Sequence, residues 1–341
     1  MDAVVVAPEA LPPAPQNPAG PAPLRRPGSV RRTSTIDMTW PGGRGTSLQL
    51  VCRARDVFTP LGGGPPVVLA DEAAQVRMST DRTVEAIACD PPRPGIERLV
   101  GARGGGHLRA ALEKLLPEEK ASGAPLYLLL DDLSGASLIS AWALSRWTDE
   151  WLRVRNESQS APPRPMEGIC IGFRPGSSAL RRDEGERVLH NCTRVPPLAN
   201  PADPAGWHEV ADLQGVTMRR ARRIDVWLDD MIRVDAHFQD SASVPEGGER
   251  MAVHEYLLTA SADPATGKLA SVGADPRTLP YRECPAAAGN VGRVLGAPMR
   301  DLRTIVLQEL AKTAGCTHLN DALRALAEVP VLADAIRARV A

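Results

Sequence analysis

Apolar and polar residues alternate along two separate stretches of the chain. In the first stretch, residues 36–40 and 48–58 alternate as strands do, with a glycine-bearing turn between them. In the second stretch, residues 222–228 and 231–240 follow the same order around a tight turn of two aspartates. A period of two on either side of a short polar turn is typical of antiparallel strands. Each stretch therefore predicts a β-hairpin.

The second hairpin is followed by two more predicted strands and three predicted helices. The strands cover 253–260 and about 268–274, with a proline- and glycine-bearing turn between them. Apolar residues then recur at helical spacing after Cys284, along 302–310 and after Cys316. A proline directly after Cys284 suits the first position of a helix. The pattern predicts that Cys284 and Cys316 each lie at a helix N-terminus.

Landmarks beyond the hairpins also occur twice. The pairs are Asp90 with Asp275, Gly101 with Gly296, and Leu108-Arg109 with Leu302-Arg303. Self-similarity in the same order indicates a duplicated unit. The first copy has Ala124 and Leu126 where the second has Cys316 and His318. A fold that does not need these polar groups in one copy suggests a chemical role for them in the other.

These patterns predict an α+β protein of two related units, a pseudo-dimer within one chain. Each unit is expected to hold an antiparallel sheet of about four strands followed by two or three helices. We expect a disordered Pro/Ala-rich tail over 1–30 and a degenerate N-terminal repeat over 31–154 that ends in a tryptophan-bearing helix. A linker and loop-rich segment over 155–216 then leads to the C-terminal repeat over 217–341.

Composition and charge exclude several classes of partner. The chain of 341 residues has 40 basic and 41 acidic residues, so its net charge of -1 predicts no binding to nucleic acid. With only 6 Trp, 3 Tyr and 3 Phe, it also lacks the aromatic residues that stack on single-stranded bases. The chain has no apolar run of about 18 residues and no secretory signal pattern, which predicts a cytoplasmic protein without a membrane span.

Six cysteines in a chain of this length are too few for a disulfide scaffold. We expect Cys52, Cys89 and Cys192 to pack as small apolar residues. Cys170 lies in a loop-rich segment, 166–215, that the pattern does not assign to an element. The histidines at 107, 190, 208 and 237 are expected to be structural or to face solvent.

The remaining cysteines lie close to other candidate ligands. The positive end of a helix favours a thiolate, so Cys284 and Cys316 are both expected to ionise readily. His318 follows Cys316 by two residues, and His254 and Glu255 lie on the strand that the same helices would cover. Sulfur, imidazole and carboxylate are ligands of transition metals. The sequence therefore predicts a metal site for Zn(II), mononuclear iron or an iron–sulfur cluster.

Two other interpretations use the same residues. In one, Cys316 or Cys284 is the nucleophile of an acyl transferase or hydrolase, with His318 or His254 as its base and a thioester as a natural substrate class. In the other, the chain is a non-catalytic interaction protein, and its cysteines only pack in the core. Wide separation of Cys284 from Cys316 would favour the interaction protein.

Several motifs of the C-terminal half resemble the bacterial family called domain of unknown function 2889. They are Glu-Cys-Pro at 283–285, Leu-Gly at 295–296 and Gly-Cys-Thr-His-Leu at 315–319, after His-Glu-Tyr at 254–256. The resemblance covers about 217–330, and the first half shares it only through the internal repeat. The family name implies no activity.

The order of strands and cysteine-led helices also resembles the iron–sulfur scaffold fold of the IscU and SufU proteins. This resemblance implies that Cys284 and Cys316 match the second and third scaffold cysteines. His254 or Glu255 then stands near the position of the first.

Overall fold

The computed structural model describes residues 10–43, 45–147, 166–180, 191–243 and 248–340. The predicted linker at 155–165 and the end of the predicted tryptophan-bearing helix lie outside these residues. Among the described residues, no helix is both long enough and apolar enough to cross a membrane.

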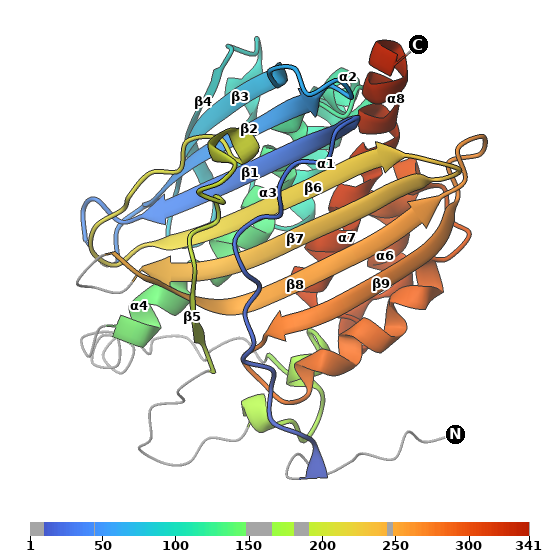
Figure 1. The fold of residues 1–341 in the computed structure, drawn as a ribbon. Coiled ribbons are helices and arrows are strands. Elements are labelled where there is room, and N and C mark those ends of the chain that lie inside the picture. The colour runs from blue at the N-terminus through green and yellow to red at the C-terminus, as the bar shows by residue number, and fades with distance from the viewer. Residues whose placement is uncertain (1–9, 44, 148–165, 181–190, 244–247, 341) are drawn as a thin grey trace.

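Within the described residues, nine strands form one antiparallel sheet (Figure 1). Their order is β4-β3-β2-β1-β6-β7-β8-β5, and β9 also pairs with β8. The strands are β1 (Ser29–Thr39), β2 (Leu48–Thr59), β3 (Val67–Met78), β4 (Val84–Asp90), β5 (Thr193–Val195), β6 (Met218–Leu228), β7 (Ile232–Ser243), β8 (Arg250–Ala262) and β9 (Leu269–Thr278).

Both predicted hairpins are present, as β1–β2 and as β6–β7. The four strands β1–β4 and the four strands β6–β9, the last of them spanning Leu269–Thr278, meet where β1 pairs antiparallel with β6. In this register Ile36 lies opposite Arg220. The two sheets predicted for separate units are therefore continuous, and the coarse prediction of helices with antiparallel strands is confirmed.

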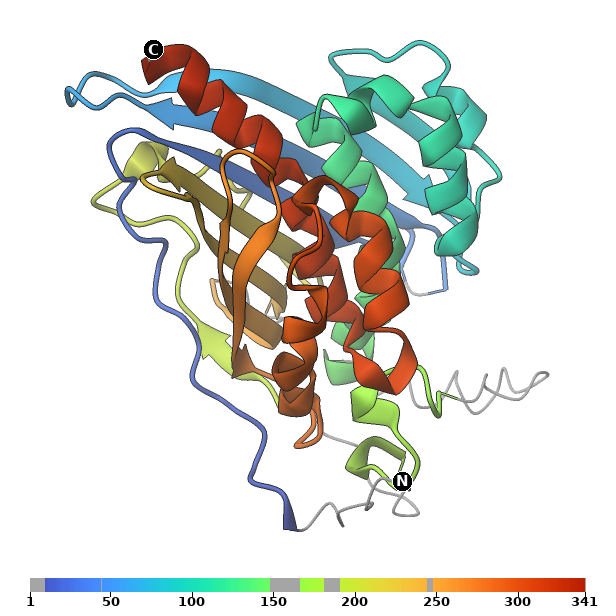
Figure 2. The ribbon, with the colours of Figure 1, turned by 90° about the vertical axis from the view of Figure 1, so that its right-hand side faces the viewer.

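The α-helices gather on one face of the sheet (Figure 2). The α-helices are α1 (Gly106–Leu115), α2 (Pro117–Ala121), α3 (Pro125–Ile139), α4 (Ala141–Trp147), α6 (Leu302–Glu309), α7 (Thr317–Arg324) and α8 (Val329–Val340). The 3-10 helices are η2 (Ile96–Leu99), η3 (Ile171–Phe173), η4 (Ser178–Leu180), η5 (Pro204–Gly206), η6 (Cys284–Val294), η7 (Met299–Asp301), η8 (Lys312–Ala314) and η9 (Ala325–Glu328).

Two apolar cores lie between the sheet and these helices. One packs the first four strands against α1 and α3, with Leu50, Leu108 and Leu133 fully buried. The other packs the last four strands against α6, α7 and α8, with Phe238 and Leu302 among its members. Apolar burial of this kind is the main favourable contribution to folding. The helix predicted to start at Cys284 is present as η6, a 3-10 helix.

The other face of the sheet is covered by two extended segments, 10–28 and 191–216 (Figure 1). Asn17 N–H donates to the Arg277 carbonyl, and Leu279 N–H donates to the Pro15 carbonyl. The first segment therefore continues the sheet beyond β9 and satisfies backbone groups there. The prediction that 1–30 is a disordered tail is wrong for 10–30, while 1–9 lie outside the described residues. Prolines tolerate this role because most of the segment is extended chain rather than a central strand.

Candidate functional site

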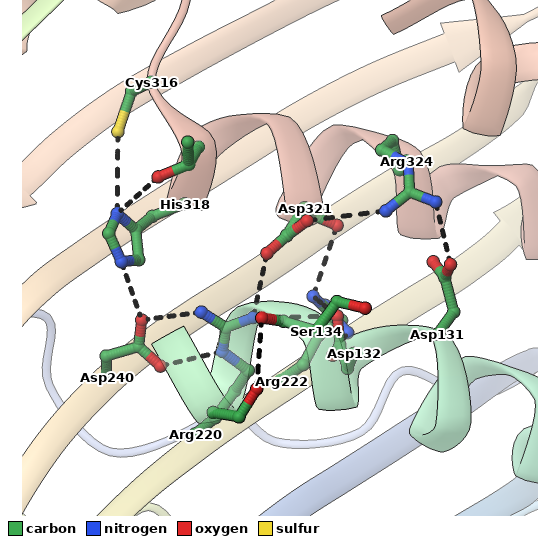
Figure 3. A network of polar contacts seen from close by, with 12 residues as sticks. Asp131, Asp132, Ser134, Arg220, Arg222, Asp240, Cys316, His318, Asp321 and Arg324 are labelled. Carbon is green, nitrogen blue, oxygen red and sulfur yellow. Dashed lines mark hydrogen bonds and ion pairs between the residues drawn. The ribbon is translucent and has the colours of Figure 1, made fainter. Parts of the chain in front are cut away.

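A network of buried ion pairs lies between the sheet and the helices (Figure 3). Arg220 of β6 donates from Nε and Nη2 to the two carboxylate oxygens of Asp240 on β7, at 2.9 and 3.0 Å. Its Nη1 donates to Asp321 Oδ2 of α7 at 2.9 Å. Asp240 is completely buried. A charge in this environment is tolerated only when it is paired and hydrogen-bonded, so Arg220 fixes the position of Asp240.

The same network continues across the helices. Asp131 of α3 accepts from Arg303 Nη1 at 2.6 Å and from Arg324 Nη2 at 2.8 Å. Asp132, the next residue, accepts from Arg222 of β6. These pairs connect α3 and α7 to the strands at the middle of the sheet. They hold the start of α7, and with it Cys316 and His318, in a defined place.

His318 lies between a thiol and a carboxylate (Figure 3). It is in the first turn of α7, and its Nε2 is 3.7 Å from Asp240 Oδ2. Its Nδ1 is 3.9 Å from Cys316 Sγ and 3.3 Å from Thr317 Oγ1. Cys316 is the N-cap residue of α7. Thiol, imidazole and carboxylate are therefore arranged in a row.

His254 of β8 completes a compact group with His318 and Asp240. His254 lies opposite Asp240 in the β7–β8 register. Its ring stacks on that of His318, with centroids 3.4 Å apart and an angle of 15° between the rings. One ligand atom from each of Asp240, His254 and His318 lies within 4.8 Å of the other two. Among the residues that the structure describes, this is the one such group of three.

Burial determines the protonation of this site. The pKa of His318 lies well below its usual value because its ring is desolvated and because Arg220 is nearby. Its imidazole is therefore neutral at physiological pH. A neutral imidazole is both a metal ligand and an acceptor of a thiol proton.

The prediction that Cys284 and Cys316 ionise readily is wrong. Burial raises the pKa of both thiols, and for Cys316 this outweighs the N–H groups of His318 and Leu319 that favour its thiolate. Cys316 is 2% exposed and Cys284 is 3% exposed. Desolvation destabilises a thiolate by more than the N-terminus of a short helix stabilises it, because the influence of the helix N-terminus is limited to the first turn.

Glu255 lies on the other face of the sheet from the histidine pair. Successive residues of a strand point to opposite faces. The Glu255 carboxylate accepts from Gln239 Nε2 at 2.9 Å and from the Ala19 N–H at 3.0 Å, and it lies 2.8 Å from His237 Nε2. The sequence predicted Glu255 at the same site as His254 and His318 because Glu255 follows His254 directly in the chain. In the structure the side chains of Glu255 and His254 lie on opposite faces of the sheet. His237, which was expected to be structural or to face solvent, is buried in this contact.

Cys284 lies beside Cys170, away from the group of two histidines and one aspartate. A Cβ atom on Gly172 would be 2.9 Å from Cys284 Sγ and 3.8 Å from Cys170 Sγ. Neither Cys284 nor Cys316 belongs to the group of ligand atoms mutually within 4.8 Å. The structure therefore brings His254 and His318 together as predicted but does not bring both sulfurs to that point.

Sequence reasoning missed Asp240 as a site residue and left Cys170 unassigned. Asp240 was only the last residue of the predicted strand 231–240. A signal was present in the strand pattern, because Arg220 and Asp240 occupy positions that face the helices, where apolar residues are expected. Paired opposite charges at such positions indicate a buried ion pair.

Comparisons with known proteins connect only the second half of the chain to a family. A search of curated proteins found no match, and a search of solved structures found none either. Neither search therefore supports the resemblance to the IscU and SufU scaffold fold. Residues 218–332, which contain His254, Cys284, Cys316 and His318, match the model of the family described as "Protein of unknown function (DUF2889)".

Proposed function

We propose that this protein binds a divalent transition-metal ion, Zn(II) or Fe(II), through His254, His318 and Asp240. The observation that carries the proposal is the approach of two imidazoles and one carboxylate to within 4.8 Å of one another. Two histidines and a carboxylate are a ligand set that proteins use for both ions. An iron–sulfur cluster is held mainly by thiolates, so this group favours a single ion.

The residues fit an ion with a small adjustment. Ligand atoms bound to one ion at about 2.0–2.2 Å lie about 3–4 Å from one another. The group must therefore contract, and one of the two stacked rings must turn so that both nitrogens point to one place. The low pKa of His318 removes the need to expel a proton from its ring.

The surroundings also supply the outer partners that metal ligands require. Asp240 keeps its orientation through Arg220, and His318 has Thr317 Oγ1 at 3.3 Å from the nitrogen that does not face Asp240. Hydrogen bonds of this kind orient the side chains that bind the metal directly, and they fix the tautomer of a histidine ligand. The site is buried, which favours ion binding over turnover of a large substrate.

Elemental analysis of protein purified without a metal-affinity tag tests the proposal. We expect His254→Ala and Asp240→Asn each to hold about one metal ion per chain fewer than the unaltered protein, because each removes one of three ligands. His237→Ala is the matched control, since His237 is also buried on a neighbouring strand but faces the other side of the sheet. Absence of metal from the unaltered protein, or equal metal in His254→Ala, would contradict the proposal.

A second candidate function rests on the order of Cys316, His318 and Asp240. In that order His318 Nδ1 accepts the thiol proton, the sulfur forms a bond to the acyl carbon of a thioester, and the leaving thiolate takes up the proton. Asp240 would orient the imidazole. Incubation with a small thioester and intact-mass measurement should then show one added acyl group, absent from Cys316→Ser. Metal content independent of His254 together with acylation would favour this candidate over the first.

We also propose that the two halves of the chain are a duplicated unit that forms a pseudo-dimer. Each half has four strands in antiparallel order followed by helices on the same face of the sheet. Superposition of 36–133 on 222–327 tests this idea. Alignment over no more than one hairpin would reject it.

A further inference from the structure

Three buried cysteines from three separate segments lie around one place in the second half of the chain. Cys170 precedes η3, Cys284 begins η6, and Cys316 precedes α7. Their exposed fractions are 8%, 3% and 2%. Gly172 lies beside the sulfurs of Cys170 and Cys284, because a Cβ atom added there would be 2.9 Å from Cys284 Sγ and 3.8 Å from Cys170 Sγ.

The segment that carries Cys170 is fastened over the other two cysteines. The Ile171 N–H donates to the carbonyl of Gly315, the residue before Cys316, at 2.9 Å. Ser178 donates from its N–H and its hydroxyl to the carboxylate of Glu283, the residue before Cys284, at 2.8 and 2.7 Å. Each contact is adjacent in the chain to one of the two cysteines. The hydrogen bonds of Ile171 and Ser178 therefore fix the placement of the segment that carries Cys170.

Backbone N–H groups point at two of the sulfurs. Those of Gly172 and Phe173 face Cys170 Sγ, and those of His318 and Leu319 face Cys316 Sγ. These contacts orient the two sulfurs before any ion binds.

Aromatic side chains close the place off from water. Tyr256 is completely buried and lies near all three thiols. Phe173 packs edge-on against Tyr281, with ring centroids 5.5 Å apart. Exclusion of water strengthens electrostatic interactions between an ion and its ligands.

We infer that Cys170, Cys284 and Cys316 form a second metal site, in which three thiolates bind a sulfur-preferring ion such as Zn(II). It lies next to the group of Asp240, His254 and His318, and it does not depend on that group. Thiolates select Zn(II) and Cu(I) over the harder ions that carboxylates prefer. Cys170 lies outside the family match at 218–332.

Binding at this site is an exchange of protons for the ion. Each of the three thiols releases one proton, and the dication then bears three thiolates and a net charge of -1. The three sulfurs are not all within 4.8 Å of one another. Binding one ion therefore requires cysteine side chains to turn to other staggered rotamers.

Cobalt(II) titration of the full chain, reduced and free of metal, tests the inference. Co(II) substitutes for Zn(II), and each thiolate ligand adds sulfur-to-cobalt charge-transfer absorption, whereas nitrogen and oxygen ligands do not. We expect this absorption in the unaltered protein, and a loss of about one third of it in Cys170→Ser, which has two of three sulfurs left. The matched control is Cys192→Ser, whose thiol is partly exposed and outside the cluster. It should keep the full signal.

The outcomes separate this site from the histidine–aspartate site. Cobalt binding without charge-transfer absorption, lost in His254→Ala, would overturn the inference and leave the proposed function standing. Charge-transfer absorption that persists in His254→Ala would support the inference alone. Full absorption in Cys170→Ser would overturn the role of Cys170. If Cys170→Ser fails to fold, slow alkylation of Cys170 through local opening of the unaltered protein gives the same decision. Added Zn(II) should slow this alkylation, and equal rates with and without Zn(II) reject the site.

Discussion

Arg219 of β6 and Asp37 of β1 form a buried ion pair across the junction between the two halves of the sheet. Arg219 Nη2 donates to Asp37 Oδ2 at 2.9 Å. The pair has a counterpart with the strands exchanged, since Arg31 of β1 donates to Asp225 of β6, also at 2.9 Å. The junction is therefore held by two ion pairs related as in a symmetric dimer.

The first prediction concerns this junction. Asp37→Ala leaves Arg219 buried without its carboxylate, so we expect the free energy of unfolding to fall by about 3–5 kcal/mol. The double variant Asp37→Leu with Arg219→Met removes both charges and should recover most of that loss. Urea unfolding followed by circular dichroism measures both. A loss in the double variant as large as in Asp37→Ala would show that packing, not charge, is responsible.

The second prediction concerns Gly135 of α3, which leaves room for the ion-pair network. A Cβ atom at Gly135 would lie 2.1 Å from both Arg220 Nη1 and Asp321 Oδ2. Gly135→Ala should therefore lower the free energy of unfolding, by an amount on the order of 2–5 kcal/mol, because a buried ion pair must separate. Gly106→Ala is the control, since nothing lies within 4 Å of its Cβ position in α1. The control should be neutral or slightly stabilising. Thermal unfolding distinguishes the two, and equal effects would count against the close approach.

The sequence predicts much of the sheet because the alternation is regular where one face of a strand is covered. Both hairpins and the strands at 253–260 and 268–274 follow from period two alone. The junction of β1 with β6 does not, because register between distant strands depends on side chains such as Arg219 and Asp37 that look like ordinary surface charges in the chain. The segment 10–28 was missed for a related reason. Backbone hydrogen bonds hold this segment, and such bonds cannot be recognised from amino-acid composition.

The candidate site was predicted in part for equally physical reasons. His318 could be found because it follows a cysteine at a predicted helix start, and His254 because it lies on the strand that the same helices cover. Asp240 could not be singled out, since its role comes from the β7–β8 register that places it opposite His254. The protonation of Cys316 was predicted wrongly because burial, which decides it, is a property of the fold and not of the helix terminus alone.

The third prediction is a loss of stability in mild acid caused by His208. Its two ring nitrogens lie 2.8 Å from the hydroxyls of Thr33 and Thr35, and it is buried. Desolvation, together with the positive charges of Arg53 and Arg55, lowers its pKa to about 3. Between pH 6.5 and 3 the unfolded chain binds a proton here and the folded chain does not, so the free energy of unfolding falls as the pH falls.

The size of the expected loss of stability depends on how much of this pH interval the experiment covers. From pH 7 to pH 5 the contribution of His208 to the free energy of unfolding should drop by about 2 kcal/mol. His208→Gln keeps hydrogen-bonding groups but cannot titrate, so its stability should depend less on pH by that amount. Urea unfolding at the two pH values measures the difference. Identical slopes for the variant and the unaltered protein would place the acid sensitivity elsewhere.

The last prediction ranks the thiols by their reactivity in the folded protein. Cys89 and Cys192 are partly exposed, whereas Cys52, Cys284 and Cys316 are buried. Alkylation requires a thiolate that the reagent can reach. Burial raises the pKa of Cys52, Cys284 and Cys316, so both conditions fail for these three. A small alkylating reagent should therefore modify Cys192 first and reach the buried thiols only when the chain opens locally or unfolds. Peptide mapping by mass spectrometry at increasing times gives the order. Rapid and selective alkylation of Cys316 would contradict it, and would favour the acyl-transfer function over metal binding, because a nucleophile must be reachable while a buried ligand need not be.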